Sequence, residues 1–494
     1  MKKLFLYAGL CLCLGLRAYA QDAAAVVKSL ETAIRQKSVE QVKPLLSPSF
    51  HIGLYPAPYV YSMLDRVFRK DSLEKLVLRR EEKTADGKRL LVRYCNLGQP
   101  AFDTYLYLNA ANQLEKVQYY DLLAGINLDK PAQLAAVIPF TYQRNRIVVT
   151  LTLNDSKKPL RLLFDTGADG MGLKKSVADE IGITANRQQS TSVVGASTQI
   201  GIASGIAMHF DTLNIPNNNS AIFPQFDADL DGLFGANFLR NYITEIDFDS
   251  SVIRLFTFGK FDYNKKASLI PLDYSLGVPG IKGKATLNNG KVLEGDFHFD
   301  TGAGYPLILF GPSVHRNQLD ENFKVAFHST TVSMGHSSPV VSGIFNGMEI
   351  GQWQLGSFTG TLQTYREGDE KWSPKGDGSF GIELINRFNW VINLADHRYS
   401  AIPNWNFAMP ANFWLKDIEW GFAGGKLIVK RVSPGTGAAD SGIMENDEVL
   451  AINGVKVADL TTEANIRKYS EEWKGREMKV EVNKFGKPWK IDIP

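Results

Sequence analysis

The hydrophobic pattern changes character several times along the chain. Between residues 22 and 46, apolar side chains recur every three or four positions, with one polar break, which predicts two packed amphipathic helices. From residue 75 onward, short runs of apolar and polar residues are separated by turn signals such as Asp86-Gly87, which is typical of antiparallel strands. We therefore expect an N-terminal α+β domain over residues 21–132.

Three further domains are predicted after it. Residues 138–260 and 265–404 consist of short predicted strands bounded by Gly, Asn, Asp and Pro. Residues 411–494 predict a strand, a Pro-Gly turn, a short helix, another strand and the hairpin turn Asn453-Gly454. A chain of 494 residues exceeds what one hydrophobic core normally serves, so several domains are expected.

Three short motifs occur twice, in the same order, in the two strand-rich stretches. FDTGA contains Asp165 in its first copy and Asp300 in its second, and DGLFG ending at Gly235 is matched by DGSFG ending at Gly381. Between these motifs, SVVGAST corresponds to VSMGHSS. The separation between copies grows only gradually, so the two stretches are predicted to be homologous lobes with small insertions in the second.

The repeated aspartates, Asp165 and Asp300, are the predicted catalytic pair. One ionised carboxylate can activate water for attack on a peptide carbonyl, while a second, protonated carboxyl polarises or protonates the carbonyl oxygen. Two carboxyls about 3 Å apart cannot both ionise cheaply, so their titration belongs to the pair. One copy alone is also explained by an ordinary strand-to-turn ending, but the ordered repeat argues against that alternative. The residues expected to support the pair, through hydrogen bonds and tight turns, are Thr166, Gly167, Thr301 and Gly302.

At these residues the chain resembles the pepsin-like and retropepsin-like aspartic peptidases, over about residues 138–402. The first lobe is especially similar to bacterial retropepsin-like lobes. The resemblance implies a mainly β, bilobal fold in which both aspartates are catalytic and the two threonines interlock. It also implies that the glycines ending the later motifs, Gly235 and Gly381, pack beneath the active-site loops.

The chain departs from the pepsin pattern near the expected substrate cleft. Neither SVVGAST nor VSMGHSS carries the tyrosine of a pepsin flap, so we expect two small flaps with tips at Gly195 and Gly335, or else plain surface hairpins. His298 lies two residues before Asp300, on the same strand face. It is expected either to satisfy a local hydrogen bond or, when charged, to lower the pKa values of the pair.

The terminal domains carry resemblances of their own. The N-terminal domain resembles the cone-shaped α+β fold of nuclear transport factor two, which hosts both enzymes and binding modules and so assigns no function. The C-terminal domain resembles a PDZ domain, in the order Ser-Pro-Gly, Ala-Ala-Asp-Ser-Gly and Asp447 before LAING, with Asn446 where that family usually has glycine. The resemblance implies capture of a peptide by strand addition, near a free carboxylate. The residues that best match the carboxylate-binding loop of that family are Trp420, Gly421 and Phe422. Glu419 precedes them, and its negative charge is unfavourable beside a bound carboxylate. The alternative is that this segment is an ordinary strand with a Gly-rich turn.

Composition narrows the classes of partner. The 55 basic and 52 acidic residues give a formal net charge of +3 without a block of like charges, so nucleic acid is not an expected partner. Cys95 is the one cysteine after residue 20, which excludes an intramolecular disulfide in a processed chain. We expect it to be a buried structural thiol. A zinc site lacks a visible framework, and no metal or organic cofactor is expected.

The first residues predict export. Two lysines precede an apolar run from Leu4 to Leu16, and Ala18-Tyr19-Ala20 fits signal peptidase cleavage after residue 20. A membrane anchor is the alternative, but the run is shorter than the roughly 20 residues that a spanning helix needs. Lipid attachment at Cys11 or Cys13 is disfavoured because each follows a leucine inside the apolar run. The expected location is periplasmic or extracellular.

The leading hypothesis is an exported aspartic endopeptidase that acts on a peptide or protein substrate. Because both lobes lie in one chain, the active site is expected to assemble in a monomer. The alternative is a non-catalytic peptide-binding or adaptor protein that retains the bilobal cleft. A serine peptidase bearing a PDZ domain is disfavoured because no Gly-x-Ser-x-Gly motif is present.

Overall fold

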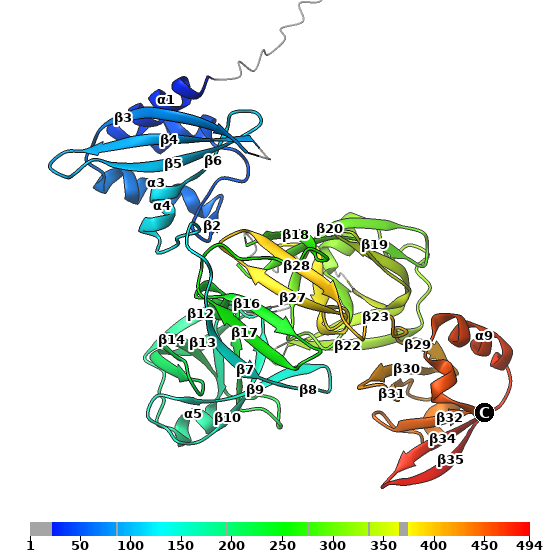
Figure 1. Cartoon of the computed structure of the whole chain (residues 1–494). Helices are drawn as coiled ribbons and strands as arrows, with labels where there is room; N and C mark the ends of the chain where they lie inside the picture. Colours follow the sequence, from blue (N-terminus) through cyan, green and yellow to red (C-terminus); the bar gives the residue numbers. More distant parts are fainter. Residues whose placement is uncertain (1–21, 85–86, 194–195, 275–276, 334–335, 365–373) are drawn as a thin grey trace, which may run out of the picture. The chain divides into compact units, whose positions relative to one another are not determined.

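The chain divides into two compact units, Met1–Ile126 and Asn127–Pro494. The computed structural model, shown in Figure 1, describes residues 22–84, 87–193, 196–274, 277–333, 336–364 and 374–494. The predicted signal peptide lies outside these residues. Over the described ranges, no helix is long and apolar enough to cross a membrane.

The N-terminal unit packs helices against an antiparallel sheet. The periodic apolar residues predicted to form helices lie on α1 (Ala23–Arg35), whose buried face includes Val26, Leu30 and Ile34. Asp22 caps its N-terminus by accepting a hydrogen bond from the amide of Ala24. The resemblance to nuclear transport factor two stays a prediction. The other main elements are α2 (Val39–Val42), α3 (Tyr59–Lys70), α4 (Gln118–Leu123), β3 (Leu73–Lys83), β4 (Gly87–Asn96), β5 (Phe102–Asn109) and β6 (Leu114–Val117).

Each predicted lobe forms a sheet, and the two sheets repeat one strand order. In the first lobe the order is β12-β13-β14-β11-β15-β10-β9-β8, and in the second it is β22-β23-β25-β21-β26-β20-β19. The matching order supports the duplication predicted from the repeated motifs. The first-lobe strands are β8 (Thr141–Gln143), β9 (Arg146–Leu153), β10 (Leu160–Asp165), β11 (Met171–Lys174), β12 (Arg187–Val193), β13 (Ala196–His209), β14 (Asn214–Phe223) and β15 (Gly232–Gly235). The second-lobe strands are β19 (Gly280–Leu287), β20 (Val292–Asp300), β21 (Leu307–Leu309), β22 (Phe327–Ser333), β23 (His336–Ile350), β25 (Phe358–Gln363) and β26 (Gly378–Gly381).

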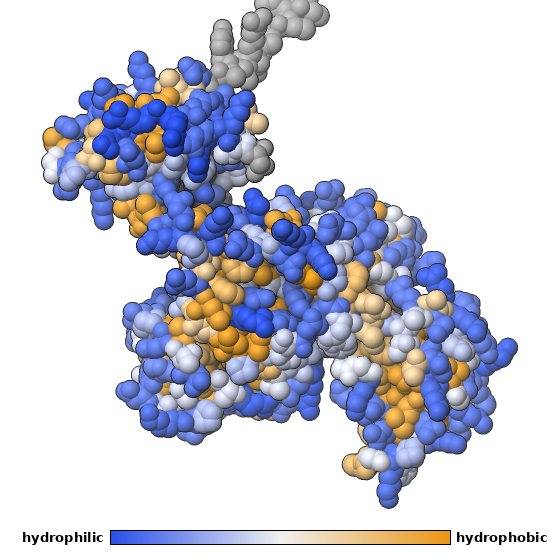
Figure 2. All heavy atoms as spheres, viewed as in Figure 1, coloured by the Kyte–Doolittle hydropathy of each residue, from blue (hydrophilic) through white to orange (hydrophobic). Residues whose placement is uncertain are grey.

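Six antiparallel strands join the two lobes. Their order is β18-β28-β27-β16-β17-β7, and the pairing of β16 with β27 links a first-lobe strand to a second-lobe strand. Buried aromatic rings of Trp390 and Tyr399 pack against Phe299, one residue before Asp300, so this sheet supports the second aspartate. Figure 2 shows apolar residues on the face where β7 and β17 lie in Figure 1. Leu134 and Val137 of β7 are exposed. The strands are β7 (Leu134–Pro139), β16 (Ile243–Asp247), β17 (Val252–Phe256), β18 (Ser268–Asp273), β27 (Phe388–Asn393) and β28 (Arg398–Pro403).

The C-terminal segment forms its own sheet around a buried core. Asn446 has a φ of 71°, so it takes the left-handed conformation expected where the PDZ family usually has glycine. Asn453 and Gly454 also have positive φ values, as the predicted hairpin turn requires. The elements are β29 (Phe413–Leu415), β30 (Ile418–Ala423), β31 (Lys426–Val432), α8 (Gly437–Asp440), β32 (Glu448–Ile452), β33 (Val455–Lys456), α9 (Glu463–Trp473), β34 (Met478–Lys484) and β35 (Lys487–Ile493).

Candidate active site

Each candidate aspartate is the last residue of a buried strand. β10 is largely buried, and it runs parallel to β15 so that Asp165 pairs with Gly235. β20 runs parallel to β26 in the same way, and Asp300 pairs with Gly381. The two repeated motifs therefore lie side by side within each lobe, and each pairing fixes the point at which an aspartate leaves the sheet.

The glycines at these pairing positions are required by close backbone contacts. A Cβ atom on Gly235 would lie 2.2 Å from the carbonyl oxygen of Ala168, and one on Gly381 would lie 2.0 Å from that of Tyr305. Real Cβ atoms do not approach backbone oxygens so closely. The structure thus places Gly235 and Gly381 directly against the active-site loops.

Gly381→Ala is expected to lower the free energy of unfolding of the second lobe by about 1–3 kcal/mol, because backbone atoms must move to admit the new methyl group. The measurement is the shift of the lobe transition in scanning calorimetry. Gly304→Ala is the matched control. Gly304 lies in the loop that Gly381 contacts, and a Cβ atom on Gly304 would meet nothing within 4 Å. Equal transition temperatures for the two variants would contradict the prediction.

The threonines of the two motifs exchange hydrogen bonds across the lobes. The Thr166 hydroxyl donates to the carbonyl of Phe299 at 2.5 Å and accepts from the amide of Thr301 at 3.0 Å. The Thr301 hydroxyl donates to the carbonyl of Phe164 at 2.7 Å and accepts from the amide of Thr166 at 3.0 Å. Both threonines are fully buried. This reciprocal set of four bonds holds the two loops in one fixed relation.

The two carboxyl groups face each other and are hydrogen-bonded to each other. Backbone amides of Gly167 and Ala168 donate to Oδ1 of Asp165 at 2.9 and 3.1 Å, and the amide of Gly302 donates to Oδ1 of Asp300 at 3.0 Å. A Cβ atom on Gly167 would lie 2.4 Å from Cγ of Asp300, and one on Gly302 would lie 2.2 Å from Cγ of Asp165. Each glycine thus leaves the space that the opposite carboxyl group occupies.

The surroundings raise the pKa of both aspartates. Burial, followed by the charge of Asp300, raises the pKa of Asp165 well above its usual value. Burial also raises the pKa of Asp300, while hydrogen bonds and the nearby His298 act in the opposite direction. As whole residues, Asp165 and Asp300 are neither fully buried nor fully exposed. The arrangement can hold one proton between two carboxyls over a range of pH, which is what acid–base chemistry on one water needs.

His298 satisfies a local hydrogen bond, one of the two roles expected for it. Its Nε2 lies 2.6 Å from the carbonyl oxygen of Lys375, and its ring lies edge-on to Phe310. Burial lowers its pKa, which favours the neutral imidazole near neutral pH. Where the ring is protonated, at acid pH, its charge lowers the pKa of Asp300.

Two residues beside the pair were missed by the sequence analysis. The Ser379 hydroxyl donates to Oδ2 of Asp300 at 3.0 Å, and Tyr305 is hydrogen-bonded to Ser379. The signal was present in the sequence, because DGSFG carries a serine at the position where DGLFG carries Leu233.

The expected flap tips, Gly195 and Gly335, lie outside the described residues. The described arms of both hairpins are paired antiparallel, with Val193 opposite Ala196 in the first lobe and Ser333 opposite His336 in the second. Both hairpins are therefore present. Their role as flaps stays a prediction.

The candidate PDZ loop is packed within its own domain. Trp420 is fully buried and donates from Nε1 to the carbonyl of Leu415 at 3.0 Å. The edge of β30 from Ile418 to Trp420 pairs with β29, and a Cβ atom on Gly421 would lie 2.2 Å from Oδ1 of Asn412. Phe422 packs partly buried against the domain core. A peptide that adds at this part of the β30 edge must therefore displace β29.

Glu419, beside this loop, is almost completely buried. Burial raises its pKa, the nearby Glu383 adds to this effect, and Arg431 and Asn412 oppose it. Asn412 donates to Glu419 at 3.2 Å and to Glu383 at 2.8 Å. The glutamate that the sequence analysis considered unfavourable for carboxylate binding thus has partners within the chain.

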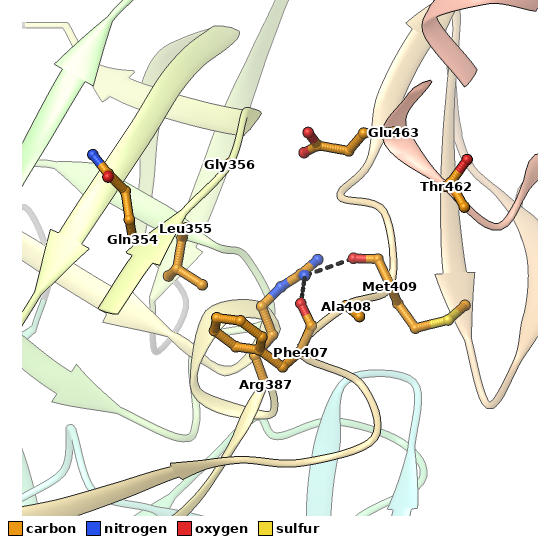
Figure 3. Close-up of a pocket in the computed structure, with 9 residues that line it drawn as sticks. All are labelled: Gln354, Leu355, Gly356, Arg387, Phe407, Ala408, Met409, Thr462 and Glu463. Carbon is orange, nitrogen blue, oxygen red and sulfur yellow. Dashed lines mark hydrogen bonds between the residues drawn. The ribbon is translucent and has the colours of Figure 1, made fainter. Parts of the chain in front are cut away.

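A cavity of about 260 Å³ is lined by residues of the second lobe, of the connecting segment and of the C-terminal domain (Figure 3). Arg387 lines it and donates to the carbonyl oxygens of Phe407 at 3.3 Å and Met409 at 2.7 Å. Glu463, at the start of α9, lines the opposite side. These contacts fix the connecting segment, and the cavity contains none of the candidate catalytic residues. Within the described ranges, no group of three or more His, Cys, Asp or Glu side chains is placed to hold a metal ion.

Comparisons with known proteins agree with these motifs. Residues 149–238 match the family model of aspartyl proteases, and residues 416–482 match that of PDZ domains. Among solved structures, an aspartic proteinase from Irpex lacteus is similar, with 12% sequence identity, a TM-score of 0.37, and coverage of 55% of this chain and 97% of that chain. A retropepsin-like aspartic protease from Rickettsia conorii has 16% identity and a TM-score of 0.20, with coverage of 26% of this chain and 93% of that chain. The search of curated proteins gave no match. The chain therefore contains a segment, residues 149–238, that matches the aspartyl protease family and a segment, residues 416–482, that matches the PDZ family.

Proposed function

We propose that this protein is an exported aspartic endopeptidase that hydrolyses peptide bonds with a water activated by Asp165 and Asp300. The observation that carries the proposal is the pair itself: two Asp-Thr-Gly carboxyls in mutual hydrogen-bond contact, locked together by four reciprocal threonine bonds. A protein that only bound peptides would not need two carboxyls with raised pKa values in one site.

The chemistry follows from one shared proton. The ionised carboxylate takes a proton from water as the water oxygen bonds to the peptide carbonyl carbon, and the protonated carboxyl gives its proton to the carbonyl oxygen. The carboxyl that gained the water proton then protonates the departing nitrogen as the C–N bond breaks. The other carboxylate recovers a proton from the tetrahedral intermediate as the new carboxylic acid forms. The pair ends with one proton, as it began.

The other domains are proposed to serve this reaction. The PDZ domain is proposed to capture a peptide or protein, with a C-terminal peptide as its ligand once the β30 edge is free. The signal sequence expected in residues 1–20 would deliver the protein to the periplasm or the extracellular space. A monomer is proposed as the active form, because both lobes already share the sheet that joins β16 to β27.

The test is hydrolysis of an unfolded protein substrate by the purified protein from pH 3 to 8, with fragments identified by mass spectrometry. We expect new termini to appear and one oxygen from labelled water to enter each new carboxyl group. A protein that binds the substrate but produces no fragment at any pH would instead support the non-catalytic peptide-binding alternative.

A further inference from the structure

The two halves of the carboxyl pair have different surroundings, although their motifs are repeats. Resting on the proposed function, we infer that Ser379 and Tyr305 are positioning residues that place the shared proton on Asp165 and keep Asp300 as the ionised base.

The donors to the two aspartates differ in where they point. Both amide donors to Asp165 reach the same oxygen, Oδ1, which leaves Oδ2 to carry a proton. The donors to Asp300 reach one oxygen each, because the amide of Gly302 bonds Oδ1 and the Ser379 hydroxyl bonds Oδ2. A proton on either oxygen of Asp300 must therefore compete with a donor already in place.

Tyr305 gives the serine hydroxyl a direction. Tyr305 is hydrogen-bonded to Ser379, and burial raises the pKa of its phenol, so the phenol stays protonated and can donate to a serine hydroxyl that itself donates to Asp300. With its oxygen accepting from Tyr305, Ser379 keeps its own hydrogen for Asp300. Hydrogen bonds that end on a charged oxygen are stronger than those between neutral groups, so this chain stabilises the ionised carboxylate.

Among the described residues of the first lobe, no side-chain hydroxyl donates to Asp165 as Ser379 donates to Asp300. Leu233 occupies the position in the first lobe that Ser379 occupies in the second. Leu233 pairs with the residue before Phe164, and Ser379 pairs with the residue before Phe299. The loop of the first lobe has Asp169-Gly170 where the second has Gly304-Tyr305, and the Asp169 carboxylate is paired with Arg240. The surroundings of Asp165 and Asp300 thus differ because side chains differ between the two copies, although the backbone fold is repeated.

The titratable and charged groups around Asp300 support the same assignment. Ser379 is the strongest influence lowering the pKa of Asp300, followed by His298 and the amide of Gly302, while burial raises it. The pKa of Asp165 is raised both by burial and by the charge of Asp300. In the reaction, Asp300 therefore removes the proton from water, and Asp165 protonates the carbonyl oxygen.

Ser379→Ala tests this assignment through the pH dependence of kcat/KM. On the acid side of the profile, kcat/KM rises with pH as Asp300 loses its proton. Removing the Ser379 hydroxyl should therefore move this acid limb to higher pH by about one unit. Tyr305→Phe should move it in the same direction by less, and Ser379→Thr, which keeps a hydroxyl, should restore the wild-type profile. Ser400→Ala is the matched control, because Ser400 is an equally buried serine on β28, outside the active-site loops.

A carbon-13 NMR titration of labelled aspartate side chains makes the test independent of catalysis. With signals assigned from Asp165→Asn and Asp300→Asn, the Cγ of Asp300 should titrate first in the wild type and at higher pH in Ser379→Ala. The inference is overturned if Asp165 ionises first, or if the Ser379→Ala titration coincides with that of Ser400→Ala. Should Ser379→Ala fail to fold, Tyr305→Phe carries the same comparison. A wild type that cleaves nothing would refute the proposed function, while the NMR order of titration would still decide where the proton lies.

Discussion

Asp165→Asn and Asp300→Asn are each expected to reduce peptide hydrolysis by about 10³-fold or more. Asparagine keeps the size of the side chain, but it can neither accept a proton from water nor donate the shared proton in the reaction. The remaining aspartate has no partner with which to divide the two roles. The measurement is kcat/KM on the best substrate found for the wild type, across pH 3 to 8. Full activity in either variant would contradict the catalytic assignment.

The same variants should change how stability depends on pH. In the folded protein the pKa of Asp165 is raised above its unfolded value, so between those two values the folded state binds more protons than the unfolded state. The wild type should therefore lose stability as pH rises from about 4 through that window. Asp165→Asn removes the titrating group and should flatten this part of the curve. Calorimetric transition temperatures at a series of pH values provide the comparison, and a lost transition would identify misfolding rather than lost chemistry.

The duplicated lobes could be predicted from sequence because each repeat carries its own local rule. A strand must end where Asp165 or Asp300 meets a turn, and a glycine must stand where the neighbouring strand passes within contact of the loop, as Gly235 and Gly381 do. Both requirements fix the residue type at particular positions of the repeated motifs, so they can be recognised in the sequence. The two lobes, which carry the same motifs in the same sequence order, also have the same order of strands in their sheets.

Contacts between distant segments could not be read from the same pattern. The pairing of β16 with β27 joins the lobes, and the pairing of β29 with β30 covers part of the strand that carries the predicted carboxylate-binding loop. Both pairings depend on which strands lie at the edges of the folded sheets. The spacing of hydrophobic residues within one strand does not specify this. The helix α3 was also missed, although Val60, Leu64 and Phe68 repeat at four-residue steps along its buried side. In that case the signal existed within a segment that the sequence analysis left unassigned.

Thr166→Val is expected to destabilise the lobes by about 2–4 kcal/mol, although valine has nearly the same shape as threonine. The substitution leaves the buried carbonyl of Phe299 without the Thr166 hydroxyl and the buried amide of Thr301 without its acceptor. Each unsatisfied buried polar group costs about 1–3 kcal/mol. Thr301→Val should cost a similar amount, because its hydroxyl makes the mirror-image pair of bonds. A loss of this size should lower the calorimetric transition of the lobes by about 5 °C or more.

Thr166→Ser and Thr301→Ser provide the matched controls, since serine keeps the hydroxyl and loses only a methyl group. They should retain most of the stability and activity that the valine variants lose. In the double valine variant all four hydrogen bonds are absent, and the two costs should not simply add, because the two threonines belong to one network of contacts. Equal behaviour of the serine and valine variants would show that the methyl packing rather than the hydrogen-bond exchange holds the loops. Because each aspartate directly precedes one of these threonines, a variant that loosens the hydrogen-bond exchange should also lose hydrolysis before it loses the fold.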